Sequence, residues 1–305
     1  MSRVIGIVGP TAVGKSKLAL SLSQALDGEV VNADSRQVYR YMDIGTAKPS
    51  LEERRSVPHH LIDIVEPNET FSLALYQPLA HKAIEDILRR DKLPLLVGGS
   101  GLYVWSLMEG WRIPKVPPNP HFRRQMEQEA AKEGVGSLHR QLQQIDPEAA
   151  KKIDPRNVRR VIRALEVYEA THTPFSQLQR KEPPPFDTLI LGLTTQRDEL
   201  YRRIEDRVDI MIKQGLVEEV SSLVEKGYGL DLPAMSSVGY RQIGQFLQGE
   251  MDLSAAIQQI NFETHRFARH QYAWFRLKDP RIRWFDIQDD MEKKVMCLLG
   301  EETKT

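Results

Sequence analysis

Residues 9–16 read GPTAVGKS, and their types and spacing are those of a phosphate-binding loop. Backbone N–H groups and a helix N-terminus stabilise anionic oxygens in such a loop, lysine adds a full charge, and a serine hydroxyl can ligate Mg²⁺. The alternative is a glycine turn whose lysine only caps a helix. We predict a di- or triphosphate site, with Ser16 as ligand of a Mg²⁺ cofactor, formed by Gly9, Pro10, Thr11, Ala12, Val13, Gly14, Lys15 and Ser16.

The acid that could serve this loop is Asp34, which follows the apolar run EVVNAD. Kinases and NTPases usually place a metal-positioning aspartate after a second apolar strand. The run at 93–98 leads into Gly98–Gly101 and not into an acid. A carboxylate at Asp34 could hold metal, cap a helix or take a proton from a nucleophile. Spacing alone does not decide, so an ATP-binding kinase is one hypothesis.

Six apolar runs alternate with helical patterns and would position these residues. Continuous apolar runs of this kind are typical of parallel strands buried on both faces. The runs are RVIGIV at 3–8, EVVNAD at 29–34, LIDIV at 61–65, LPLLVG at 93–98, TLILGLT at 188–194 and IRWFDI at 282–287. We predict an α/β fold, a P-loop NTPase-like parallel sheet flanked by helices, with the first helix running from about Gly14 to Leu26.

The middle of the chain breaks this rhythm. IPKVPPNP at 113–120 and KEPPPF at 181–186 are rich in proline, and only helical patterns lie between them. An all-helical domain inserted into the α/β domain is the simplest interpretation. The predicted organisation is a first core part at 1–114, a helical insertion at 115–186, and a second core part with C-terminal helices at 187–305.

Composition excludes several classes of protein. The 305 residues have a net charge of zero, so bulk basicity does not indicate nucleic acid, and a basic site must come from local clustering. The single cysteine, Cys297, excludes a disulfide framework or a cysteine-rich zinc site within one chain. Neither a signal peptide nor a membrane-length apolar run is present. We expect a cytoplasmic protein, acting as a monomer without a membrane partner.

An arginine-rich stretch, DPRNVRRVIRALEV, begins at Asp154. With Asp154 as N-cap and Pro155 as first helical residue, its arginines would share one face and its aliphatic residues the other. The functional interpretation is contact with phosphodiesters, and the alternative is a solvated face paired with acids. The predicted stripe is Arg156, Arg159, Arg160 and Arg163. A second basic cluster, interleaved with aromatic residues that could stack bases or form core, lies at 265–285.

The chain resembles the bacterial tRNA dimethylallyltransferases, also called tRNA isopentenyltransferases. Five segments carry the resemblance in order, from about residue 4 to residue 285: GPTAVGKS, NADSRQVYRYMDIGTAKP, VPHHLID, GGSGLY and SSVGYRQ. The resemblance implies transfer of a dimethylallyl group from dimethylallyl diphosphate to N6 of the adenosine 3′-adjacent to the anticodon in tRNA, releasing diphosphate. A sister group prenylates free adenine nucleotides, and that activity is the nearer alternative to a kinase.

The resemblance also assigns roles to residues of this sequence. Asp34 would deprotonate N6, Ser100 would lie beside the substrate channel, and Lys15 with Arg203 or Arg207 would stabilise the departing diphosphate. The sequence cannot separate Arg203 from Arg207. Tyr39 and Tyr41 either shield an allyl cation or simply pack. The implied tRNA contacts are Asp34, Ser35, Arg36, Gln37, Ser100, Arg123, Arg159, Arg160, Val161, Ile162 and Arg163.

Overall fold

The structure is a computed structural model that describes residues 3–288 and 290–302. The chain forms two compact units. The core unit joins the chain up to Met108 to the chain from Pro185 onward, and the helical unit is Glu109–Pro184. The helical unit therefore begins and ends earlier in the chain than the 115–186 segment derived from the prolines.

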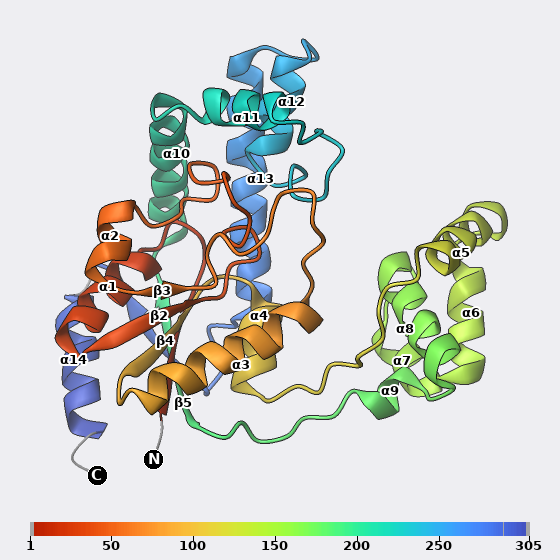
Figure 1. Cartoon of the computed structure of the whole chain (residues 1–305), viewed down its shortest axis with the longest axis horizontal. Helices are drawn as coiled ribbons and strands as arrows, with labels where there is room; N and C mark the ends of the chain where they lie inside the picture. Colours follow the sequence, from red (N-terminus) through yellow and green to blue (C-terminus); the bar gives the residue numbers. More distant parts are fainter. Residues whose placement is uncertain (1–2, 289, 303–305) are drawn as a thin grey trace. The chain divides into compact units, whose positions relative to one another are not determined.

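The core unit is built on a six-stranded, all-parallel sheet (Figure 1). Its strand order is β3-β2-β4-β1-β5-β6, and this parallel α/β sheet confirms the predicted fold class. The strands are β1 (Arg3–Val8), β2 (Gly28–Asn32), β3 (His59–His60), β4 (Leu93–Val97), β5 (Asp187–Thr194) and β6 (Ile282–Asp286).

Helices cover both faces of this sheet because its central strands are apolar on both. Ile5 and Ile7 point towards α1 (Lys15–Ala25) and α14 (Met291–Glu302), with which they share a core. Gly6 has the opposite orientation in the pleat and meets Met108 of α4 (Gly101–Met108). The helix α3 (Leu73–Arg89) packs against β2, β4 and α4.

The predicted strand at 61–65 is wrong. The strand in this region is His59–His60, and α2 (Leu51–Ser56) precedes it. Leu61 and Asp63 have positive φ angles, 64° and 57°, which break an extended conformation. Asn32 holds this turn by donating its side-chain amide to the Leu61 carbonyl. Val65 keeps only an isolated bridge, to Tyr39.

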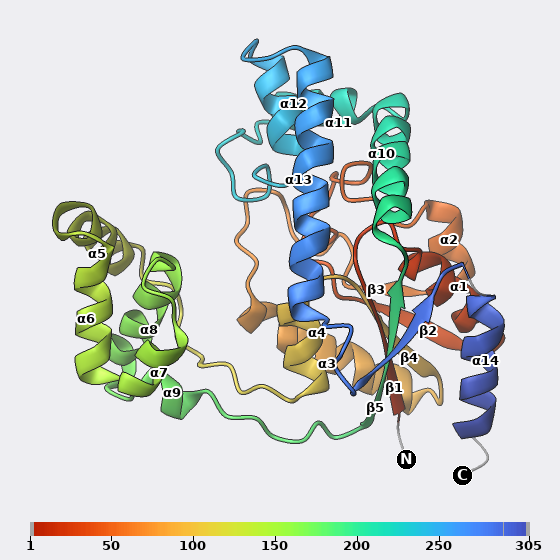
Figure 2. The same ribbon diagram turned by 180° about the vertical axis from the view of Figure 1, so that it is seen from behind.

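Four further helices stand at the edge of the sheet where β5 ends (Figures 1 and 2). They are α10 (Arg197–Lys213), α11 (Leu216–Glu225), α12 (Tyr240–Leu247) and α13 (Leu253–Trp274). Their apolar faces form a second core with Val38, Tyr39 and Met42 from the segment after β2. This packing brings α10 and α13 over the carboxyl ends of the strands, where ligands bind in open α/β sheets.

The helical unit contains α5 (Pro120–Glu133), α6 (Val135–Ile145), α7 (Pro147–Lys152), α8 (Val158–Thr171) and α9 (Phe175–Leu178) around a separate core. The predicted start of α8 is wrong. Its N-cap is Asn157, whose side chain accepts from Arg160 N, because Asp154 accepts instead from the backbone and guanidinium of Arg156 in a preceding turn. Across residues 3–288 and 290–302, every helix is too short or too polar to cross a membrane.

Candidate active site

The phosphate loop joins β1 to α1, as predicted. Gly9 has φ 140°, and a Cβ there would lie 2.4 Å from the Leu193 carbonyl oxygen, so only glycine fits. Ala12 (φ 63°) and Gly14 (φ 102°) are also left-handed, which turns successive N–H groups towards one side. Lys15 Nζ donates to the carbonyls of Gly9 (3.0 Å) and Pro10 (2.7 Å) and so lies across the loop.

Both candidate arginines reach this loop from α10. Arg203 Nε donates to the Ala12 carbonyl (3.1 Å), and an Arg207 nitrogen donates to the Thr11 hydroxyl (3.1 Å). Their spacing of four places both on one face of the helix. The structure therefore does not choose between Arg203 and Arg207 but brings both to the loop.

Positive charge is concentrated here at an electrostatic cost. Burial lowers the pKa of Lys15 from 10.5 to about 7, repulsion from Arg207 adds to this, and Asp34 opposes it. Burial also lowers the pKa of Arg207. Asp34 and Glu199 compensate these cations only in part, so an anion would relieve their remaining repulsion.

Asp34 lies at the mouth of the same loop, just beyond β2. Ala33 N donates to the Val97 carbonyl, and Gly98 permits the close approach, since a Cβ there would lie 2.1 Å from the Ala33 carbonyl oxygen. The Asp34 backbone N–H donates to Asn32 Oδ1 (3.0 Å), and Asp34 Oδ1 accepts from Arg36 N (2.8 Å). The second carboxylate oxygen keeps its acceptor capacity for a substrate.

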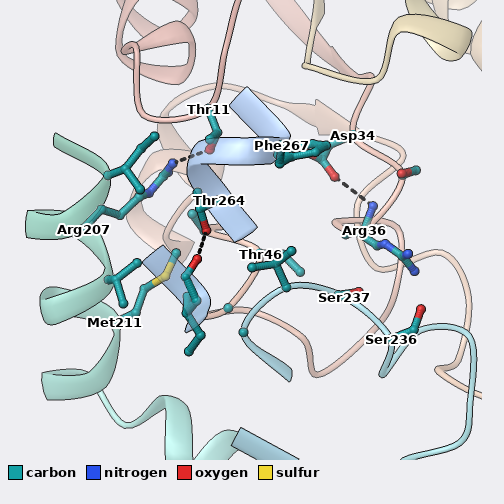
Figure 3. Close-up of a pocket in the computed structure, with 18 of the residues that line it drawn as sticks. Thr11, Asp34, Arg36, Thr46, Arg207, Met211, Ser236, Ser237, Thr264 and Phe267 are labelled. Carbon is teal, nitrogen blue, oxygen red and sulfur yellow. Dashed lines mark hydrogen bonds between the residues drawn. The ribbon is translucent and has the colours of Figure 1, made fainter. Parts of the chain in front are cut away.

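Two cavities of the core unit meet at Asp34, Thr11 and Arg207. The smaller, about 70 Å³, extends over the phosphate loop to Lys15, Ser16 and Gln37. The larger, about 330 Å³, extends away from the loop (Figure 3). Arg207 and Met211 enter it from α10, and Asp34 and Arg36 lie opposite (Figure 3). The predicted residues in its lining are Thr11, Asp34, Ser35, Arg36, Ser100 and Arg207.

The sequence did not reveal most of the larger cavity's wall. One side is apolar and comes from α10 and α13: Ile204, Val208, Met211, Ile260 and Phe267. The other side comes from two loops, as Gly45, Thr46 and Ala47 and as Ser236, Ser237, Val238 and Gly239. Those loops lie within DIGTAKP and SSVGYRQ, so the quoted motifs carried the signal. The apolar residues on α10 and α13 have the spacing of ordinary helix packing, so the sequence did not mark them as cavity residues.

A buried glutamine joins the loop to the rest of the site. Gln271 of α13 accepts from Thr11 N (2.7 Å) and donates to the Gly99 carbonyl (3.2 Å). A Cβ at position 99 would lie 2.0 Å from the side-chain nitrogen of Gln271. Glycine at this position therefore leaves room for the Gln271 side chain. In the sequence, Gln271 lies among basic and aromatic residues, and nothing there marks it as a residue of the site.

A Mg²⁺ ion would have Ser16 as its protein ligand. Ser16 lines the smaller cavity beside Lys15. Within residues 3–288 and 290–302 there is no group of three or more His, Cys, Asp or Glu able to hold a metal. Mg²⁺ commonly takes one or two protein ligands and completes its shell with water and substrate phosphates, so this donor set fits it.

The helical unit uses two of its predicted arginines internally. Glu166, 2% exposed, accepts from the guanidinium of Arg123 (two bonds of 2.8 Å), from Arg163 (2.6 Å) and from Asn119 N (2.7 Å). Burial raises the pKa of Glu166, but these hydrogen bonds outweigh it and lower the pKa overall. Arg123 and Arg163 therefore each pair with a protein carboxylate, and their contact with tRNA stays a prediction.

Val161 and Ile162, two further predicted tRNA contacts, have buried side chains. Their side chains are 0% and 2% exposed in the core of the helical unit, so they anchor α8. Arg159 and Arg160 lie on its outer side, exposed, and neither has an acidic partner in the described chain. Arg156 belongs to the preceding turn and pairs with Asp154 (2.7 Å). The predicted four-arginine stripe is reduced to Arg159 and Arg160.

The remaining aromatic candidates divide between core and surface. Tyr39 is buried, and Tyr41 stacks on Tyr228 with ring centroids 6.2 Å apart, so neither lines the two cavities. Packing is therefore the correct alternative for both tyrosines. In the 265–285 cluster Phe275 is fully buried, whereas Trp274 is 41% exposed and Phe267 borders the larger cavity.

Comparison with known proteins identifies the family. The family model described as IPP transferase matches residues 37–278. The chain is 54% identical to a tRNA dimethylallyltransferase of Thermomicrobium roseum, covering 98% of this chain and 92% of that protein. It is 48% identical to the tRNA dimethylallyltransferase of Dehalococcoides mccartyi, over 98% and 92% of the two chains.

Solved structures agree with the sequence comparison. The full-length tRNA isopentenylpyrophosphate transferase of Bacillus halodurans is 40% identical, with a TM-score of 0.73, covering 100% of this chain and 96% of that one. A eukaryotic dimethylallyltransferase acting on tRNA is 30% identical, with a TM-score of 0.80, covering 94% and 74%. These similarities confirm the P-loop NTPase-like fold. The chain belongs to the IPP transferase family, the family of the tRNA dimethylallyltransferases.

Proposed function

We propose that this protein transfers the dimethylallyl group of dimethylallyl diphosphate to N6 of the adenosine 3′-adjacent to the anticodon in tRNA, releasing diphosphate. The observation that carries the proposal is the position of Asp34. Its carboxylate lies on the wall shared by the phosphate-loop cavity and the larger, partly apolar cavity. A diphosphate in the first and an adenine in the second would meet beside it.

The loop and the arginines stabilise the leaving group. The loop N–H groups, Lys15, Arg203 and Arg207 surround the place where negative charge grows as the allylic C–O bond breaks. Mg²⁺, which the Ser16 hydroxyl would help to hold, would neutralise part of the same charge. The diphosphate leaves with the electron pair of the broken bond.

Asp34 activates the nucleophile. The lone pair of adenine N6 is delocalised into the ring, so the amine is weakly nucleophilic until a carboxylate accepts its hydrogen bond. N6 then forms the bond to the allylic C1, and its proton passes to Asp34. The apolar side chains Val208, Met211 and Ile260 offer the prenyl group a wall that excludes water.

Both alternatives are less well supported. Relatives named for action on tRNA match nearly the whole chain, including the helical unit, which favours tRNA over a free adenine nucleotide. An ATP-dependent kinase has the weakest support, because the acid beside the loop also faces an apolar cavity. We further propose a monomer, and a cytoplasmic protein, since one cysteine in 305 residues suits a reducing compartment.

The test is prenyl incorporation into unmodified tRNA with dimethylallyl diphosphate and Mg²⁺. Wild type should incorporate the group, and Asp34→Ala should lose about 10²–10⁴-fold in rate while still binding tRNA. Asp34→Asn is the matched control for loop structure, because its carbonyl oxygen can still accept from Arg36 N.

Asp34→Asn should be as inactive as Asp34→Ala if the carboxylate takes the proton. An active Asp34→Asn protein would show that Asp34 only shapes the loop. A folded wild type that binds tRNA without prenylating it would overturn the proposed function and direct attention to ATP.

A further inference from the structure

The carboxylate of Glu219, in the first turn of α11, holds a loop of the active site. Its Oε2 accepts from Asp43 N (2.9 Å) and Ile44 N (2.8 Å), and its Oε1 accepts from Gly45 N (3.1 Å) and the Tyr240 hydroxyl (2.5 Å). Three consecutive backbone N–H groups thus converge on one side chain. Only a carboxylate has two oxygens that can each accept two such bonds.

The loop also packs closely against Tyr240, the other partner of Glu219. Tyr240 of α12 is fully buried and lies close to Gly45, where a Cβ would be 2.4 Å from the ring. The proximity of Glu219 raises the pKa of Tyr240, although burial is the larger cause. The phenol therefore remains a hydrogen-bond donor, and the glycine allows ring, carboxylate and loop to meet.

The gripped segment forms a wall of both cavities. Gly45, Thr46 and Ala47 line the larger cavity, and Thr46 and Ala47 also line the one over the phosphate loop. Gln37, three residues after Asp34, donates its amide to the carbonyls of Thr46 (3.0 Å) and Ala47 (3.1 Å). The position of this segment is therefore tied to that of the Asp34 turn on one side and to α11 on the other.

The segment has no regular structure of its own. Residues 43–47 belong to no helix or strand, and Ala47 has a positive φ of 50°. A loop with so few ladder hydrogen bonds depends on side-chain contacts for its conformation. Glu219 supplies such contacts from α11.

We propose that Glu219 is a positioning residue for prenyl transfer, which holds residues 43–47 as the shared wall of the two cavities. The inference rests on the proposed function. Glu219 does not line either cavity, so it acts through the loop and not on the substrates. Its loss should leave phosphodiester contacts intact and disturb the alignment of the reacting groups.

The test pairs Glu219→Gln with Glu218→Gln. Both changes remove one negative charge from the first turn of α11, but Glu218 is exposed and does not contact the loop. The glutamine at 219 would present an NH₂ group to backbone donors. We expect kcat to fall about 10–100-fold in Glu219→Gln, as for small misplacements of reacting groups. Its dissociation constant for tRNA, and all constants of Glu218→Gln, should stay unchanged.

A graded partner change sharpens the test. Tyr240→Phe keeps the ring but removes one of the four hydrogen bonds, so kcat should fall only about 2–10-fold. Hydrogen exchange at the amides of residues 43–45 should quicken in Glu219→Gln more than in Tyr240→Phe, at temperatures well below unfolding. A merely structural role would lower the melting temperature without changing the kcat of the folded protein.

Each outcome has a distinct meaning. Unchanged hydrogen exchange at residues 43–45 in Glu219→Gln would show that Glu219 does not hold the loop. Faster exchange with unchanged kcat would overturn the positioning role. Absence of prenyl transfer by the wild type would overturn the proposed function. The hydrogen-exchange measurement would still test whether Glu219 holds residues 43–45.

Discussion

Arginine pairs in the core unit and in the helical unit have different partners. In the core unit Arg203 and Arg207 donate to the phosphate loop, and Arg207 has no acidic partner in the described chain. In the helical unit Arg123 and Arg163 converge on the buried Glu166. Arg207 has its charge available for a ligand and Arg203 has only a longer ion pair with Glu199 (3.7 Å), whereas the second pair is neutralised by a buried carboxylate. An arginine-rich pattern therefore predicts function only when the acidic partners of its arginines are known.

The largest effect should come from Arg207. Arg207→Ala should lower kcat/KM for prenyl transfer about 10²–10³-fold, since it removes a preorganised cation from the leaving group. Lys213→Ala, at the exposed end of the same helix, is the control and should leave the rate unchanged. Steady-state kinetics with tRNA would check this, and equal rates for the two variants would contradict the comparison.

Glu166→Gln should destabilise the helical unit. Arg123 and Arg163 would lose the charge that neutralises them, at a cost of about 3 kcal/mol. Urea unfolding, with hydrogen exchange assigning the loss to residues 120–171, would measure it. Glu169→Gln, exposed on the same helix, is the control. If the two variants are equally stable, the Glu166 cluster is not the structural centre that its burial indicates.

Lys15 should make diphosphate binding depend on pH. Its pKa of about 7 means that the unliganded protein loses this charge as the pH rises above 7, so binding must then take up a proton. Affinity for inorganic diphosphate should fall by up to about tenfold per pH unit above 7. Calorimetry in buffers of different ionisation enthalpy would detect the uptake. Lys15→Arg keeps its charge and should lack this component, so an identical pH profile would refute the assignment.

The same shift has an opposite consequence for folding. Between pH 7 and 10.5 the unfolded chain binds more protons at Lys15 than the folded one, so stability of the unliganded protein should rise with pH there. Lys15→Met should remove this contribution from the pH dependence of urea unfolding.

The smallest effect should come from Arg159 and Arg160. Replacing either by alanine should reduce the slope of log K for tRNA against log salt by about 1, as expected for one lost phosphate contact. Arg163→Ala is the matched comparison and should affect stability more than the salt slope. A salt slope that changes with Arg163 but not with Arg159 would reverse the comparison between free and paired arginines.

Much of the fold and of the phosphate site could be predicted, because both depend on local patterns. The strands at β1, β4 and β5 are continuous apolar runs, and GPTAVGKS encodes its own loop geometry. The errors occurred where distant contacts override a local preference. Asn32 holds a turn at Leu61 within an apolar run, and Asn157 caps α8 because Asp154 is engaged by Arg156.

By itself the sequence determined a parallel α/β core, the phosphate loop with Lys15 and Ser16, and Asp34 as the acid beside it. Only the tertiary structure decided that both Arg203 and Arg207 reach the loop, that Glu166 pairs with two arginines, and that Glu219 grips residues 43–45. The physical reason is the distance along the chain between the interacting residues. A loop motif is stabilised by hydrogen bonds between near neighbours, whereas the partner of a charge is chosen by packing between segments far apart in the chain.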